Sequence, residues 1–194
     1  MAELILTGRI LGILWTTASW LSTEESIQVT NQNYEIAKEI QSFLAKLGFE
    51  YTIYQGPTEN KRPGYKYDYY RMKVYNKNFI ELLRNNYNWT GRREEQRYYP
   101  KFDSYKQEVE FLKYYISSQY YCREQSVEWG DRKQKRLKIY VNKSFADILN
   151  KKISDIIGVS KNKIQKHHQS DILMYLFYQS QKDIALILDF IGSA

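Results

Sequence analysis

The chain has 194 residues, of which 43% are hydrophobic and 16% aromatic, and a formal net charge of +7. This length predicts one domain of ordinary size or two small ones that share a core. The single Cys122 excludes an intrachain disulfide, and no segment reads as a transmembrane helix or signal peptide, so we expect a cytoplasmic protein without membrane contact.

The composition is basic and rich in tyrosine, with 29 Lys and Arg residues and 19 tyrosines. Such a surface suits nucleic acid, because cations contact phosphates while phenol rings stack on bases. AT-rich coding also enriches Lys, Asn, Ile and Tyr. Composition alone therefore leaves nucleic-acid binding open.

Elements in the first half follow from hydrophobic periodicity and capping residues. Leu4–Trp15 is apolar on nearly every face, which predicts a buried helix, with Gly8 and Gly12 allowing close approach of another helix. The later elements are expected to be a strand over Ser26–Thr30, a helix over Tyr34–Leu47 capped by Asn33 and ended by Gly48, strands near Phe49–Tyr54 and Tyr67–Tyr75, and a helix near Asn78–Asn85. Few residues remain for an opening hairpin, so we expect that hairpin to be reduced.

The second half repeats this order. Gly130-Asp131 predicts a hairpin turn between two strands. The expected elements are a helix over Val109–Ser118, strands over Tyr120–Trp129 and Lys135–Val141, a helix over Ser144–Ile157, strands near Lys161–His167 and Ile172–Tyr178, and a helix over Lys182–Ile191.

Two near-copies of one pattern thus occupy the chain, and such repetition sets the architecture. We predict an α+β fold of two pseudo-symmetric αββαββα halves, at residues 1–88 and 108–194, each with an antiparallel sheet and packed through central helices. Residues 89–107 would connect them. Within this connector, the clusters Arg92-Arg93 and Arg97-Tyr98-Tyr99 either grip a nucleic-acid backbone or form a solvated linker.

The doubled order resembles the two-repeat, monomeric LAGLIDADG homing endonucleases. The resemblance spans nearly the whole chain and rests on Ile10–Ala18 and Phe111–Gln119 at the motif-helix positions, and on the helix ends at Leu47-Gly48 and Ile157-Gly158. It implies that the two motif helices pack at a pseudo-two-fold axis. Acidic residues at their ends would hold divalent metal over the scissile phosphates, and two four-stranded sheets would form a saddle in the DNA major groove.

The departures from this family pattern bear on function. Thr17 and Gln119 occupy the positions where the family has metal-binding carboxylates, and hard divalent cations require such oxygens. No acid occurs in residues 10–23 or 111–123; the nearest candidates are Glu24, Glu25 and Glu124. We therefore expect no catalytic residue, no metal site and no cofactor.

The family's helix interface has small residues; Gly12 keeps this pattern in the first repeat, but Tyr114 takes its position in the second. Close helix crossings depend on small side chains, so this residue predicts helices that are pushed apart or tilted.

Strand alternation predicts a basic face. It places Arg71 and Lys73 opposite Met72 and Val74, and Arg136, Lys138 and Tyr140 opposite Leu137, Ile139 and Val141. The same pattern is also typical of any half-exposed sheet. The candidate nucleic-acid-binding residues are Gln28, Arg71, Lys73, Arg132, Lys133, Arg136, Lys138, Lys161, Lys163 and Gln165. Because no Cys or acid lies at ligand spacing from His167-His168, we interpret these histidines as surface residues.

The sequence therefore favours a monomer that binds double-stranded DNA, sequence-specifically and without cleavage. Three alternatives stay open: an active or nicking Mg²⁺-dependent endonuclease that uses Glu24, Glu25 or Glu124, a maturase-like RNA binder, and a protein-interaction scaffold.

Overall fold

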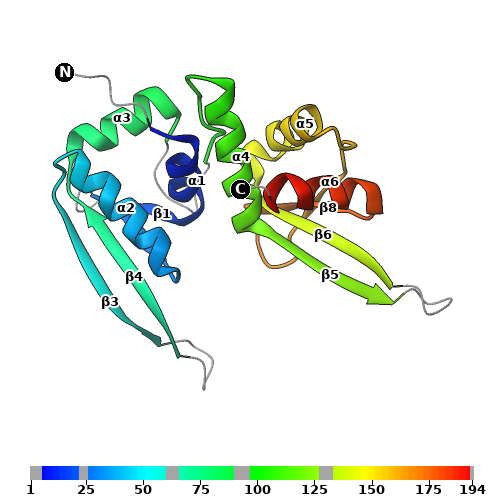
Figure 1. Ribbon diagram of the computed structural model, residues 1–194, viewed down its shortest axis with the longest axis horizontal. Coiled ribbons are helices and arrows are strands. Elements are labelled where there is room, and N and C mark those ends of the chain that lie inside the picture. The colour runs from blue at the N-terminus through cyan, green and yellow to red at the C-terminus, as the bar shows by residue number, and fades with distance from the viewer. Residues whose placement is uncertain (1–5, 22–25, 60–65, 90–96, 127–132, 193–194) are drawn as a thin grey trace.

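The computed structural model describes residues 6–21, 26–59, 66–89, 97–126 and 133–192. The two halves of the chain run through their elements in the same order (Figure 1). The first half contains α1 (Gly8–Thr17), β1 (Ala18–Leu21), β2 (Ser26–Asn31), α2 (Tyr34–Lys46), β3 (Tyr51–Glu59), β4 (Lys66–Val74) and α3 (Lys77–Tyr87). The second half contains α4 (Tyr105–Gln119), β5 (Tyr120–Ser126), β6 (Lys133–Asn142), a 3-10 turn η1 (Lys143–Phe145), α5 (Ala146–Ile157), β7 (Ile164–Lys166), β8 (Leu173–Tyr178) and α6 (Gln181–Gly192).

Each half builds one four-stranded antiparallel sheet. The strand orders are β1-β2-β4-β3 and β5-β6-β8-β7, which are equivalent. Helices α1 and α4 pack together at the centre, and the β3–β4 and β5–β6 hairpins diverge from them (Figure 1). The predicted α+β class and αββαββα order are confirmed, and β1 is short, as expected.

Local signals explain where the helices begin and end. The Asn33 side chain accepts a hydrogen bond of 2.9 Å from the Glu35 amide, which caps α2. Gly48 and Gly158 follow α2 and α5 with φ of 66° and 80°, a left-handed conformation that glycine adopts without steric cost. None of the helices in the described ranges is long and apolar enough to cross a membrane.

The central interface depends on two glycines of α1. A Cβ at Gly8 would lie 1.9 Å from the Gln107 carbonyl oxygen, and one at Gly12 would lie 2.9 Å from Tyr114 Cβ. The Tyr114 side chain therefore packs directly on Gly12. The expectation that Tyr114 separates the helices at this point is wrong, because the glycine on the opposite helix provides the space that the tyrosine needs. Burial also raises the pKa of the Tyr114 phenol.

The connector ties the halves together. Arg97 is only 2% exposed and Tyr99 is buried, so neither backbone gripping nor a solvated linker describes them. The Trp15 indole donates to the Tyr98 carbonyl at 2.9 Å, and the Ser144 hydroxyl donates to the Arg97 carbonyl. This segment thus links α1 to η1, the turn that precedes α5. Arg92 and Arg93 lie outside the described residues.

Candidate nucleic-acid interface

One face of the first sheet is apolar and the other polar. Ile27, Val29, Met72 and Val74 are buried, at most 1% exposed. On the opposite face, the strand register aligns Gln28 with Lys73 and aligns Thr30 with Arg71. The predicted positions of Gln28, Arg71 and Lys73 therefore share one face, which we call the outward face of this sheet.

The outward face of the second sheet combines cations with aromatic rings. Lys138 Nζ lies 4.3 Å from the Tyr175 ring centroid and 5.9 Å from that of Phe177. The Tyr175 hydroxyl donates to Gln165 Oε1 at 2.7 Å. A cation above an aromatic face loses some of its mobility, and the Gln165 amide is oriented by its phenol partner. Lys138 and Gln165 are thus pre-positioned on this face.

Two arginines stand directly opposite each other on the same face. The β5–β6 register pairs Arg123 with Arg136, in the row next to Lys138. Like charges opposed across an antiparallel pair are destabilising. A polyanion bound on this face would offset that repulsion. The sequence reasoning missed Arg123, which the register between β5 and β6 places on this face.

Two of the predicted lysines lie outside the strands. Lys161 and Lys163 are exposed but precede the three-residue β7, so the prediction that they share a strand face with Gln165 is wrong. The strand begins late because the side-chain amide of Asn150 makes two hydrogen bonds to the backbone of Asn162. Its Nδ2 donates to the Asn162 carbonyl at 2.7 Å, and its Oδ1 accepts from the Asn162 amide at 3.1 Å.

Lys133 begins β6 with an exposed side chain. Alternation puts it on the face of Leu137 and Ile139 rather than that of Arg136. Arg132 lies outside the described residues.

Thr17 and Gln119 are the last residues of α1 and α4, as the motif-helix alignment predicts. A cavity of about 730 Å³ between these helix ends and the start of α2 is lined by both. The Thr17 hydroxyl donates to the Ile13 carbonyl of its own helix at 2.7 Å. The acid in this cavity's lining is the exposed Glu35, and within the described ranges no three His, Cys, Asp or Glu residues cluster for a metal.

Of the alternative acids, Glu124 alone lies in a described segment. Glu124 is exposed on β5 and pairs with Lys135, which alternation places on the face opposite Arg123 and Arg136. Glu24 and Glu25 lie outside the described residues.

A buried cation lies at the end of α1. The Arg97 guanidinium donates to the Trp15 and Ala18 carbonyls, and it lies 4.8 Å from the Trp89 ring centroid. These carbonyls belong to the negative end of the helix dipole, which favours a cation. Sequence reasoning missed this role because the partners lie about eighty residues apart in the chain.

Paired central helices and two equivalent antiparallel sheets define the LAGLIDADG class of fold. Residues 11–86 match the family model of the LAGLIDADG-like domain. The resemblance inferred from the sequence is therefore confirmed, and the fold of the chain is that of the LAGLIDADG homing endonucleases.

Three solved structures illustrate the likeness. The LAGLIDADG meganuclease I-CpaMI, bound to uncleaved DNA, is 11% identical with a TM-score of 0.60 over 95% of this chain and 84% of that one. An I-DmoI variant in complex with its target DNA is 16% identical with a TM-score of 0.55, over 96% and 95%. Full-length DUF199/WhiA from Thermatoga maritima is 16% identical with a TM-score of 0.55 over 95% of this chain, which spans only 54% of that protein. No curated protein sequence matches the chain significantly.

Proposed function

We propose that this protein binds double-stranded DNA sequence-specifically, through the outward faces of its two sheets, and does not cleave it. The observation that carries the proposal is that Arg71 and Lys73 of one sheet, and Arg123, Arg136 and Lys138 of the other, lie on the face opposite the apolar core. The structures of I-CpaMI and I-DmoI with DNA support this choice of partner.

Side-chain chemistry indicates which of these residues would contact bases and which would contact phosphates. Arg71 and the amides of Gln28 and Gln165 suit the edges of guanine and adenine in the major groove, whereas Lys73 and Lys138 suit phosphates. Lys133, Lys161 and Lys163 would add backbone contacts at the periphery, and Arg132 stays a candidate for a phosphate contact. We further propose that residues 1–88 and 108–194 are two repeats joined by residues 89–107, and that a monomer suffices because each repeat supplies one sheet.

Two features support the absence of cleavage. Thr17 and Gln119 provide neutral oxygens where phosphodiester hydrolysis by metal ions requires carboxylates. Arg97 places a buried positive charge at the end of α1. A divalent cation at that helix end would be repelled by the guanidinium.

The test is selection from a random duplex pool with Mg²⁺ present, at two salt concentrations. If the five outward cations each neutralise one phosphate, log K falls with log salt with a slope of about −4.5. A fourfold rise in salt then weakens binding about 500-fold. An enriched site that is retained intact supports the proposal.

Other outcomes contradict it. Cleaved product would show that Thr17 and Gln119 do not prevent hydrolysis. Stronger competition by structured RNA than by duplex DNA would indicate a maturase-like RNA binder. Absence of salt-sensitive retention would indicate a protein-interaction scaffold.

A further inference from the structure

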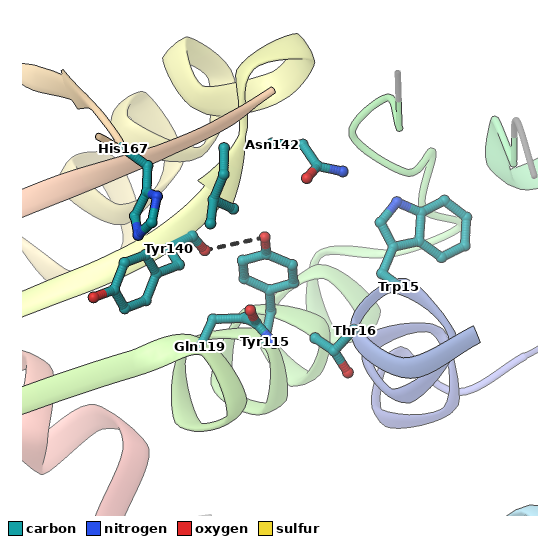
Figure 2. Close-up of a pocket in the computed structure, with 8 residues that line it drawn as sticks. Trp15, Thr16, Tyr115, Gln119, Tyr140, Asn142 and His167 are labelled. Carbon is teal, nitrogen blue, oxygen red and sulfur yellow. Dashed lines mark hydrogen bonds between the residues drawn. The ribbon is translucent and has the colours of Figure 1, made fainter. Parts of the chain in front are cut away.

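A second cavity, of about 300 Å³, lies where the second sheet meets the ends of α1 and α4 (Figure 2). Alternation along β6 puts Tyr140 and Asn142 on the outward face, in line with Arg136 and Lys138. The cavity therefore lies at the inner end of the proposed DNA-binding face. Its lining is Trp15, Thr16, Tyr115, Gln119, Tyr140, Asn142, His167 and Leu173.

Aromatic rings form much of the wall. Figure 2 shows Trp15 on one side of the site, and Tyr140 and His167 on the other. The Tyr140 and His167 ring centroids lie 5.9 Å apart in an edge-to-face arrangement. The Tyr115 hydroxyl donates to the Tyr140 carbonyl at 3.3 Å, and the Trp15 indole donates to the Tyr98 carbonyl. Both rings also pack on the core, Trp15 against Trp89 with ring centroids 5.0 Å apart and Tyr115 against Phe111 at 5.6 Å. The half-buried rings of Tyr140 and His167 are therefore the ones that offer a face for stacking.

Two side-chain amides and an imidazole supply the polar groups. Asn142 occupies the N-cap position of η1 without making a capping hydrogen bond. Within the described part of the chain, neither the Asn142 nor the Gln119 side chain makes a hydrogen bond. His167 Nδ1 accepts from the Gln169 amide at 3.3 Å, so the neutral imidazole carries its proton on Nε2 as a donor. Each amide offers both a donor and an acceptor.

We propose that this cavity binds a nucleobase that is unstacked from the bound duplex. Proteins that hold an extruded base stack it between aromatic side chains and hydrogen-bond its Watson–Crick edge. A carboxamide pairs with the donor–acceptor pattern of such an edge. The volume is at the lower end of the range for ligand sites, about 300–1,000 Å³, which suits one base. The inference rests on the proposed DNA binding, although a free nucleotide presents the same base chemistry.

The experiment uses the selected duplex with 2-aminopurine placed at one central position at a time. This base analogue fluoresces weakly when stacked and brightly when unstacked. We expect one position to brighten several-fold on binding, and the double variant Gln119→Leu/Asn142→Leu to abolish that rise. Leucine keeps the approximate volume of each amide and removes its hydrogen bonds. The matched control is Gln41→Leu/Asn85→Leu, which changes the same residue types on α2 and α3 and should keep the rise.

A second measurement separates the two sources of the base. Addition of each nucleoside monophosphate to the free protein should shift the side-chain amide resonances of Gln119 and Asn142 if free nucleotides bind. A shift without any fluorescence rise overturns the unstacked duplex base and assigns the cavity to free nucleotides. Duplex retention without a rise and without a shift refutes base binding while leaving the proposed function intact. Loss of duplex retention itself contradicts the proposed function, and the resonance shifts then decide base binding independently.

Discussion

Replacing Arg123 and Arg136 with glutamine should weaken DNA binding and stabilise the fold at the same time. The two residues supply two of the five cations on the outward faces. Each phosphate contact contributes about 0.9 to the salt slope, so the double variant should lower the slope from about 4.5 to about 2.7. A fourfold rise in salt would then weaken binding about 40-fold rather than about 500-fold.

Stability should change in the opposite direction. Arg123 is exposed and Arg136 half-buried, and they face each other across the β5–β6 ladder. Removing like charges from directly opposed positions should raise the free energy of unfolding by about 0.2–1 kcal/mol. A variant that merely damaged the fold would lose binding and stability together, whereas here binding falls while stability rises.

The assay is duplex binding by fluorescence anisotropy across a salt series, with thermal unfolding of the same samples. The matched control for Arg136→Gln is Lys135→Gln, which removes the same charge one residue away but from the opposite face. The control should keep the slope of the unmodified protein. Equal slopes for Arg136→Gln and Lys135→Gln would refute the assignment of the outward face, because net charge alone would then explain the effect.

The remaining predictions concern the centre of the molecule and are all read from thermal unfolding. Gly8→Ala should lower the free energy of unfolding by more than about 3 kcal/mol, and the melting temperature by about 6–12 °C, because the new Cβ would overlap the Gln107 carbonyl. The control Gly192→Ala meets no atom within 4 Å and should change the melting temperature little. Arg97→Met should cost about 3 kcal/mol or more because buried carbonyls lose a charged donor; an unchanged midpoint would contradict its capping role. Asn150→Ala should cost about 1–3 kcal/mol, as two backbone groups of Asn162 lose their partner.

Sequence predicted the features that depend on neighbouring residues. Asn33 and Gly48 mark the ends of α2 because caps act within one helical turn, and alternation placed Arg71 and Lys73 on one face. Features set by distant segments were not predicted. The late start of β7 depends on Asn150, whose amide engages the Asn162 backbone from another element.

In the candidate site, too, the features set by neighbouring residues were predicted and those set by distant segments were not. Alternation identified Lys138 within its strand, but pairing of Arg123 with Arg136 required the register between strands. Arg97 was predicted to be a surface cation because its carbonyl partners belong to the distant end of α1 and to the first residue of β1. No local pattern records such a contact.

The end of α1 bears on our proposal that the protein does not cleave DNA. A helix C-terminus carries partial negative charge, which a metal ion or a basic side chain can offset. In this chain Arg97 fulfils that role from the connector, and its guanidinium is almost fully buried. Since burial lowers the effective dielectric, the repulsion between this charge and a second cation nearby is stronger than it would be in water. If the protein does not cleave DNA, as we propose, a carboxylate introduced at position 17 would supply a ligand without removing the charge that opposes the metal. We therefore predict that hydrolysis would also require replacement of Arg97.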